Sequence, residues 1–271
     1  MFEKLTSPQN QYIKRMRSLS TRKGREKTNL MSVEGVRFVA EALDAARRGI
    51  TSIDAVFCEE GFEESIEAEL VQAMAAVGAR TFSCPSVLFK TLVDTETPQG
   101  IAAAVAKPTF PQPTFAEEDL YLVVDRVQDP GNLGTMIRTA AAAGANAIFC
   151  LKGTVDPYNP KVLRATMGSI FRVPVKFTPD AKNLVRALRR ANCQLVAADI
   201  AGHQYHFEAD YTNSTAIIVG NEGQGIQPAL LEAADLRVQI PLAQKVESLN
   251  AAVACGILLY EVVRFRRTSG Q

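Results

Sequence analysis

The stretch IPLAQKVESLNAAVACGILLYEVVRFRR, from Ile240 to Arg267, changes character twice along its length. It begins as the end of an apolar strand, passes through a polar turn and continues as a long apolar helix. The turn contains Glu247, Ser248 and Asn250. Taken alone, Ser248 has the position and the hydroxyl group of a helix N-cap. Polar side chains between two apolar runs also suit a binding site, and the rest of the chain decides between these interpretations.

Two earlier stretches have the same organisation. VVDRVQDPGNLGTMIRTAAAAGA runs from Val123 to Ala145, and AIIVGNEGQGI runs from Ala216 to Ile226. Each begins as a buried strand and then enters a polar turn that contains glycine. In a parallel α/β sheet the carboxyl ends of the strands lie along one edge, where ligands bind. We therefore expect the three stretches to converge into one site. Their polar turns contain no His or Cys, which argues against acyl transfer and thiol chemistry.

Arg138 stands among apolar side chains in a helix expected from about Leu133 to Ala143. Because a buried arginine without a partner is very costly, we expect Arg138 to meet an acid, a phosphate or a backbone carbonyl. Glu222, in the glycine-rich turn GNEGQG, is the candidate acid. Asn132 is expected to cap the start of the helix. The glycine spacing matches neither the dinucleotide fingerprint nor a phosphate loop, which disfavours an ordinary nucleotide-binding enzyme.

Two alternations of strand and helix predict an α/β fold with two domains. Residues 1–106 are expected to form a smaller N-terminal α/β domain. The segment 107–118 contains three prolines and no apolar period, which predicts a linker. Residues 119–271 are expected to form a parallel-sheet domain, because strands such as YLVVDRV (Tyr121–Val127) are largely apolar. FRVPVKF (Phe171–Phe177) is predicted at a sheet edge, since its proline cannot donate to a ladder.

The composition is that of a globular protein. The chain has 271 residues, a net charge of +1 and 47% hydrophobic residues. It has no apolar run of membrane-spanning length, and its first 18 residues lack the apolar core of a secretory signal. The five cysteines are scattered without a CxxC pair, and there are two histidines. We therefore expect buried free thiols, a reducing cytoplasmic compartment and no metal site.

Basic residues are concentrated near the N-terminus. Residues 1–27 contain eight Lys or Arg against Glu3 and Glu26, a local charge of +6. The segment 59–69 contains six acids and no base. This separation of charge fits a face that meets a polyanion, and it fits an ordinary solvated helix face equally well. Residues 21–29, within the basic region, are expected to form a charged loop.

Together, the three stretches resemble the signature of the SpoU/TrmH family of RNA ribose 2′-O-methyltransferases, in the SPOUT superfamily. The matching motifs are NLGTMIRTA (Asn132–Ala140), GNEGQG (Gly220–Gly225), and IPL followed by ESLN (Ile240–Asn250). One departure is Gln244, where the family commonly has glycine. The sequence SVEGVRFVAEAL (Ser32–Leu43) resembles the family's ribosomal-protein-like RNA-binding domain.

The resemblance implies a C-terminal domain with a deep trefoil knot, a homodimer, and S-adenosylmethionine bound in the knot. The residues that it implies for cofactor binding are Gly220, Asn221, Gly223, Ile240, Leu242 and Leu249. Those that it implies for catalysis are Asn132, Arg138, Glu222, Ser248 and Asn250. The basic N-terminal residues that we expect to contact RNA are Lys14, Arg15, Arg22, Lys23 and Arg25.

The implied reaction transfers a methyl group to a ribose 2′-hydroxyl. Its site must align oxygen, methyl carbon and sulfur, and must deal with a very weakly acidic proton. The family's proposed base corresponds to Arg138, yet a guanidinium has a pKa above about 12. Arg138 is therefore either a base or a clamp on the adjacent phosphate. Ribosomal RNA is the preferred substrate because of the N-terminal resemblance. The alternatives are transfer RNA, or a non-catalytic RNA-binding role for the same fold.

Overall fold

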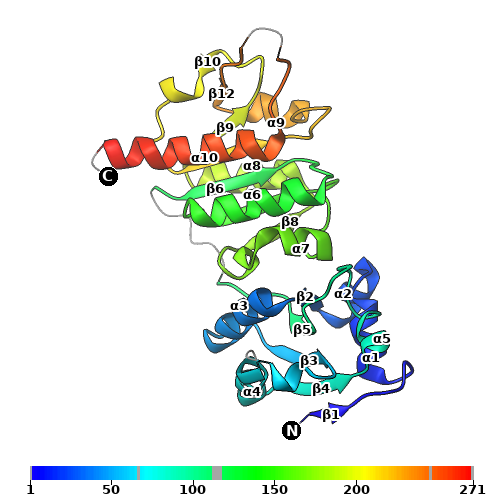
Figure 1. Ribbon diagram of the computed structural model, residues 1–271. Coiled ribbons are helices and arrows are strands. Elements are labelled where there is room, and N and C mark those ends of the chain that lie inside the picture. The colour runs from blue at the N-terminus through cyan, green and yellow to red at the C-terminus, as the bar shows by residue number, and fades with distance from the viewer. Residues whose placement is uncertain (1, 66–67, 112–117, 244–245, 270–271) are drawn as a thin grey trace. The chain divides into compact units, whose positions relative to one another are not determined.

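The computed structural model describes residues 2–65, 68–111, 118–243 and 246–269. The chain forms two compact units, and each is an α/β structure (Figure 1). Unit 1 contains the chain up to Phe110 together with Tyr158–Phe171. Unit 2 contains Pro111–Pro157 and the chain from Arg172 onward. The segment Tyr158–Phe171 therefore packs with unit 1, although the sequence places it within the second alternation of strands and helices.

Unit 1 is built on a mixed sheet with the strand order β1–β4–β3–β5–β2. β5 is antiparallel to β2 and β3, whereas β4 is parallel to β1 and β3. Ile13 and Met16 of α1 and Phe89 of α5 share one buried core with this sheet. The strands of unit 1 are β1 (Glu3–Lys4), β2 (Leu30–Glu34), β3 (Ile53–Glu59), β4 (Arg80–Cys84) and β5 (Ile101–Ala106). Its helices are α1 (Gln11–Ser18), α2 (Arg22–Thr28), α3 (Val36–Arg47), η1 (Phe62–Glu64), α4 (Ala68–Ala76), α5 (Ser86–Phe89), α7 (Pro160–Thr166) and η2 (Ser169–Phe171).

Unit 2 contains a sheet with the strand order β10–β12–β9–β11–β6–β7–β8, and the strand pairs that the structure describes in it are parallel. Its strands are β6 (Leu120–Val124), β7 (Ala147–Leu151), β8 (Val175–Thr178), β9 (Gln194–Ala198), β10 (Gln204–Tyr205), β11 (Thr215–Val219) and β12 (Leu236–Gln239). Its helices are α6 (Pro130–Ala142), α8 (Ala181–Arg190), η3 (His206–Glu208), α9 (Pro228–Ala233) and α10 (Ala251–Thr268).

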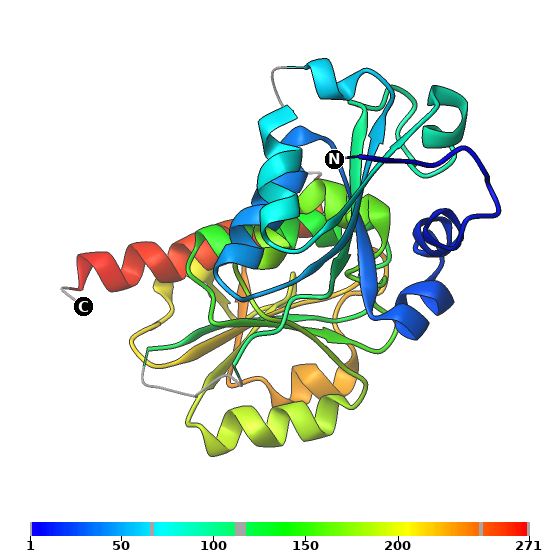
Figure 2. The ribbon, with the colours of Figure 1, turned by 90° about the horizontal axis from the view of Figure 1, so that it is seen from below.

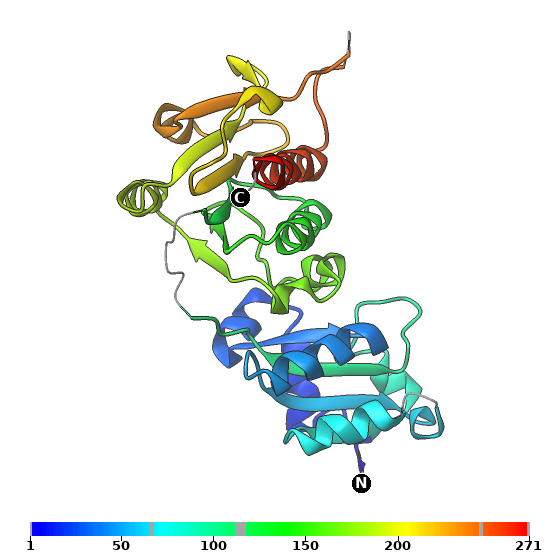
Figure 3. The same cartoon turned by 90° about the vertical axis from the view of Figure 1, so that its left-hand side faces the viewer.

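The sheet of unit 2 is covered on both faces. Figures 2 and 3 show α8 and α9 on one face, with α6 and α10 on the other. The central strands β6 and β11 are buried along their whole length, as their apolar sequences predict. β8 lies at an edge of the sheet directly after Pro174, which confirms the edge prediction. The parallel α/β architecture predicted for this part of the chain is therefore confirmed.

One helix cap differs from its prediction, and a second decides between the two interpretations of Ser248. α6 begins at Pro130 and is capped by Asp129, whose Oδ1 accepts the Asn132 N–H at 2.7 Å. α10 is capped by Asn250 rather than Ser248. Aspartate, asparagine and serine cap helices almost equally well, so local preference could not separate neighbouring candidates. The cap at Asp129 leaves the Asn132 side chain available for other contacts.

The predicted loop at residues 21–29 is also wrong, because the structure forms α2 there. Thr21 caps this helix through its side chain. Arg25 is only 2% exposed and donates to the carbonyls of Leu19 at 2.7 Å and Ser20 at 3.1 Å. A charged sequence thus forms a packed helix, because the Arg25 side chain faces inward and donates hydrogen bonds to the backbone carbonyls that follow α1.

Candidate functional site

A cavity of about 310 Å³ lies at the carboxyl ends of β9, β11 and β12. Its volume is within the range of about 300–1,000 Å³ typical of small-molecule sites. The three strands are parallel neighbours, so the turns that follow them share one edge of the sheet. All six residues expected to bind the cofactor line the cavity, and so do two expected catalytic residues. These lining residues are Gly220, Asn221, Gly223, Ile240, Leu242 and Leu249, with Glu222 and Ser248.

The loop Gly220–Gly225 forms one wall of the cavity. A Cβ atom on Gly220 would lie 2.3 Å from the Gly225 carbonyl carbon, so only glycine fits this close approach of backbone to backbone. The Asn221 N–H donates to the Gly225 carbonyl and the Gly225 N–H donates to the Asn221 carbonyl, both at 3.0 Å. The Asn221 side-chain oxygen accepts the N–H groups of Gly223 and Gln224, both at 2.9 Å. The loop is therefore a closed turn held by its own backbone and one amide side chain.

Three of the expected catalytic residues form a hydrogen-bonded chain. The Asn132 Nδ2 donates to Glu222 Oε1 at 2.8 Å, and the Asn250 Nδ2 donates to Asn132 Oδ1 at 2.9 Å. The Asn250 Oδ1 is engaged as well, since it accepts the N–H groups of Ala252 and Val253 at the start of α10. Each of the three motifs contributes one member of this chain, which confirms their predicted convergence.

Arg138 departs from the prediction. It is exposed on α6, and it forms no hydrogen bond or ion pair with any residue that the structure describes. Six residues at about 100° each place Arg138 roughly 120° around the helix axis from Asn132. The buried face of α6 instead carries Leu133 and Ile137. The predicted burial of Arg138 and its pairing with Glu222 are therefore wrong, because Arg138 faces a different side of α6 from Asn132, which is the residue of this helix that contacts Glu222.

Asp199 and Glu222 are the charged groups among the described residues that line the cavity. Asp199 follows β9 directly, and its Oδ1 accepts the Ala201 N–H at 3.0 Å. Asp199 is not among the residues predicted for the site, although it stands at a strand end as they do. Ile240 and Leu242 add apolar surface to the lining. The cavity thus suits a ligand that is partly cationic and partly apolar.

The polar turn before α10 is described in part. Ser248 and Leu249 line the cavity, and the Leu249 side chain remains 36% exposed there. Gln244, the departure from the family pattern, lies outside the described residues. Ser248 therefore has a place at the cavity wall instead of the capping role that its position in the sequence also allowed.

Comparison with known proteins identifies the family. Residues 119–260 match the model of the SpoU rRNA Methylase family, and residues 10–103 match the MRM3-like substrate binding domain. The chain belongs to the SpoU rRNA methylase family. The 23S rRNA (guanosine(2553)-2′-O)-methyltransferase RlmP of Bacillus subtilis is 37% identical over 96% of this chain and 99% of its own length. A 23S rRNA (uridine(2479)-2′-O)-methyltransferase of Streptomyces viridochromogenes is 34% identical over 69% of this chain and 67% of its own.

Solved structures of SpoU methylases share the fold over almost the whole chain. The AdoMet-bound rRNA methyltransferase from Sinorhizobium meliloti matches with a TM-score of 0.84 and 32% identity, and the match covers 98% of each chain. AviRb from Streptomyces viridochromogenes, in complex with AdoMet, matches with a TM-score of 0.86 and 29% identity, covering 97% of this chain and 100% of that one. At the level of the family, these matches confirm the expected methyltransferase that uses S-adenosylmethionine (AdoMet) on an RNA ribose. The trefoil knot and the homodimer stay predictions.

The cavity of this SpoU methylase fits S-adenosylmethionine by its chemistry. The cofactor carries a positive sulfonium and an ammonium group, and Asp199 and Glu222 supply negative charge to the lining. Ile240, Leu242 and Leu249 would cover its less polar parts. Among the described residues there is no group of His, Cys, Asp and Glu placed to hold a metal ion. None of the described helices has the length and apolar character needed to cross a membrane.

The basic residues expected to contact RNA have different surroundings in unit 1. Lys14 and Lys23 are exposed. Arg15 and Arg22 each pair with a carboxylate, at 2.9 Å and 2.7 Å. Arg25 is buried and donates to backbone carbonyls, so its assignment as an RNA contact is wrong. Because the Arg25 guanidinium is buried and already donates to backbone carbonyls, it cannot also bind a phosphate of RNA.

The five cysteines of this SpoU methylase are buried free thiols, as predicted. Burial raises the pKa of Cys255 to about 12, and burial together with the charge of Asp156 raises the pKa of Cys150 to about 12. Both thiols therefore stay protonated near neutral pH. No cysteine or histidine is among the described residues that line the cavity.

Proposed function

We propose that this SpoU methylase transfers a methyl group from S-adenosylmethionine to a ribose 2′-hydroxyl of ribosomal RNA. The observation that carries the proposal is the Glu222–Asn132–Asn250 chain of hydrogen bonds beside a cavity of cofactor size. Within the proposal, residues 1–106 bind the RNA, 107–118 link the parts, and 119–271 carry out the transfer. The homodimer and the trefoil knot are part of the proposal and rest on family membership.

Ribosomal RNA is favoured over transfer RNA by the extent of the structural matches. A TrmH/SpoU tRNA modifying enzyme of A. aeolicus aligns with 56% of this chain, at a TM-score of 0.50 and 30% identity. The rRNA methyltransferase of Sinorhizobium meliloti aligns with 98%. The additional length contains the part that matches the MRM3-like substrate binding domain. The match to an rRNA methyltransferase therefore includes a substrate-binding part of the chain that the match to the tRNA enzyme does not cover in full, and this favours a ribosomal substrate.

The cofactor supplies a methyl group on a positively charged sulfur. Asn132 donates to Glu222 and accepts from Asn250, so its amide is held in one orientation. The second carboxylate oxygen of Glu222 has no partner among the described residues. We infer that this oxygen and the fixed amides orient the ribose hydroxyl toward the methyl carbon. Ser248 offers a further hydroxyl at the same wall.

Arg138 is proposed to clamp the RNA phosphate beside the reacting ribose. A general base must lie within hydrogen-bond reach of the proton that it takes, and Arg138 is exposed on α6 outside the cavity lining. An exposed guanidinium can instead grip a phosphate with two parallel hydrogen bonds. Its positive charge would also favour the alkoxide that forms as the 2′-hydroxyl loses its proton to water, before this oxygen bonds to the methyl carbon and the bond between that carbon and the sulfur breaks.

The proposed homodimer uses the outer face of α10. Val253 and Tyr260 are 51% and 49% exposed, and a spacing of seven residues places both on the same side of the helix. An apolar stripe of this kind is typical of a helix that packs against a partner. Light scattering on the purified protein tests this, with Tyr260→Glu as the variant expected to dissociate the dimer.

The activity test uses purified protein, ribosomal RNA transcribed without modifications, and S-adenosylmethionine with an isotope-labelled methyl group. We expect label in a 2′-O-methyl nucleoside after nuclease digestion and mass spectrometry. Asn132→Ala should retain cofactor binding and lose most of the label, because it breaks both links of the hydrogen-bonded chain. Label on a base would contradict the proposal, and RNA binding without any label would support the non-catalytic alternative.

A further inference from the structure

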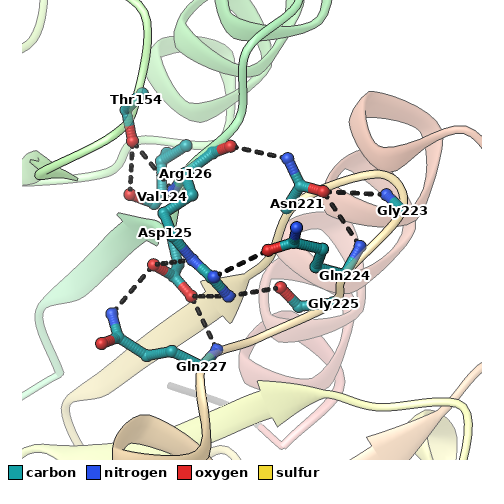
Figure 4. A network of polar contacts seen from close by, with 9 residues as sticks. All are labelled: Val124, Asp125, Arg126, Thr154, Asn221, Gly223, Gln224, Gly225 and Gln227. Carbon is teal, nitrogen blue, oxygen red and sulfur yellow. Dashed lines mark hydrogen bonds and ion pairs between the residues drawn. The ribbon is translucent and has the colours of Figure 1, made fainter.

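Asp125 and Arg126 lie outside the three motifs, and neither lines the cavity. They follow β6 directly, and both contact the segment Gly220–Gln227, which follows β11 (Figure 4). The loop that forms the cavity wall is therefore attached at several points to the end of the neighbouring strand.

Asp125 is 0% exposed, and both of its carboxylate oxygens are engaged. Its Oδ2 accepts the Gln227 N–H at 2.7 Å, and its Oδ1 accepts the Gln227 Nε2 at 2.9 Å. The Arg126 Nε donates to Oδ1 at 3.2 Å. Because a buried carboxylate is stable only when it is fully paired, these contacts fix Asp125. They also fix the chain where it leaves the loop.

Arg126 has a φ of +59°, a conformation that residues with a side chain rarely adopt. Its N–H donates to Thr154 Oγ1 at 3.1 Å, and its carbonyl accepts the Asn221 Nδ2 at 2.9 Å. Its guanidinium donates to Gln224 Oε1 at 3.0 Å and to the Gly225 carbonyl at 3.3 Å. A strained backbone conformation persists only where surrounding contacts stabilise it. Here Arg126 is stabilised by Asn221 at the start of the loop and by Gln224 and Gly225 at its end.

We propose that Asp125 and Arg126 are positioning residues that hold the loop Gly220–Gly225 in the shape that binds S-adenosylmethionine, and so set the affinity for the cofactor. This inference rests on the proposed function of the cavity. All six residues of the loop line the cavity, and its three glycines offer a ligand backbone groups alone, so the shape of the backbone decides how these groups are placed. Without the guanidinium, binding itself must order the loop, and that cost weakens affinity. The transfer step at saturating cofactor is little affected.

The direct test is Arg126→Gly. Glycine removes the guanidinium and accepts a positive φ without strain, so the change isolates the side chain. We expect the Kd for S-adenosylmethionine, measured by calorimetry without RNA, to rise about tenfold, as for the loss of one or two net hydrogen bonds. KM for the cofactor should rise in parallel, with kcat changed less than about twofold. A residue that merely stabilises the fold would lower the unfolding temperature and leave Kd unchanged.

Gln224 allows the same contact to be tested from the loop. Gln224→Leu removes the acceptor for Arg126 from an exposed side chain, and Kd should rise about threefold or more. Gln224→Glu keeps an acceptor and should restore Kd to within about twofold of the wild type. The matched control is Arg189→Ala, which removes a guanidinium that donates to the Ala233 carbonyl at 3.0 Å away from the cavity lining, and its Kd should not change.

Binding of S-adenosylmethionine by the wild type and by the variants tests the proposed function and the role of Arg126 separately. A wild type that binds S-adenosylmethionine, with Arg126→Gly and Gln224→Leu binding equally well, overturns the inference and leaves the proposed function standing. A wild type that does not bind the cofactor overturns the proposed function itself. If Arg126→Gly does not fold, the Gln224 pair decides: weaker binding by the Leu variant alone supports the inference, and equal binding by both overturns it.

Discussion

Gly220→Ala should open the cavity wall without removing any side chain. The new Cβ would lie 2.3 Å from the Gly225 carbonyl carbon, 2.4 Å from the Ile226 nitrogen and 2.5 Å from the Gly225 oxygen. All three are backbone atoms, and non-bonded carbons prefer separations of about 3.5–4 Å, so the loop must move by about 1 Å. This movement breaks the two hydrogen bonds between Asn221 and Gly225, each with a net value of about 1 kcal/mol. A loss of about 2 kcal/mol corresponds to roughly 30-fold weaker binding of S-adenosylmethionine.

Calorimetric titration of the purified variant with S-adenosylmethionine measures this loss. The matched control is Gly256→Ala in α10, outside the cavity lining, where the nearest atom to the new Cβ is the Thr139 Cγ2 at 3.6 Å, an ordinary contact. We expect the control to lose less than about threefold in affinity, as is usual for surface changes without a clash. A Gly220→Ala protein that binds as tightly as the wild type would refute the reasoning, because the loop would then be able to reshape at no cost.

Four further predictions concern other parts of the chain. Asn250→Asp keeps a helix cap but removes the donor to Asn132, so transfer should fall about tenfold or more while the unfolding temperature is retained, in parallel activity and melting assays. Arg138→Lys should lower transfer by a uniform factor across a pH–rate profile if Arg138 clamps phosphate; activity that recovers as pH rises toward the lysine pKa would point to a base. Arg25→Ala should lower the free energy of unfolding by about 2 kcal/mol in urea titrations, since it leaves buried carbonyls unpaired, and a loss below 0.5 kcal/mol would contradict its structural role. The five buried thiols, with the Cys255 pKa raised to about 12, should resist a thiol reagent at pH 8 until guanidinium unfolds the chain, and rapid labelling of the native protein would count against this.

The position of the site could be predicted because it follows from strand geometry. Three apolar strands, each followed by polar residues, place those residues along one edge when the strands run parallel. The structure brings Asn132, Glu222 and Asn250 together there, although Asn132 and Asn250 are more than one hundred positions apart in the sequence. Asp199 follows the same rule and could have been found by applying it to every buried strand.

The burial of individual arginines could not be predicted. The helix around Arg138 is rich in alanine, which fits buried and exposed faces equally well, so the sequence gives little information about the orientation of the helix. Arg25 shows the opposite error. It stands in a strongly basic segment, yet it lies buried against carbonyls of Leu19 and Ser20 that have left the helical hydrogen-bond pattern. Whether a charged side chain faces solvent depends on whether nearby backbone carbonyls need a hydrogen-bond donor, and the periodicity of the sequence does not show this.

The caps show how the start of a helix can serve structure and chemistry together. Asp129 caps α6, and this leaves the whole amide of Asn132 free for Glu222 and Asn250. Asn250 does both tasks, because its oxygen caps α10 while its nitrogen donates to Asn132. The N-termini of α6 and α10 therefore meet beside Glu222, and each carries partial positive charge. If methyl transfer takes place beside Glu222, as proposed, a ribose oxygen that becomes negative there would be stabilised by both helices, and the polar turns that begin as caps would also supply the electrostatic setting for the reaction.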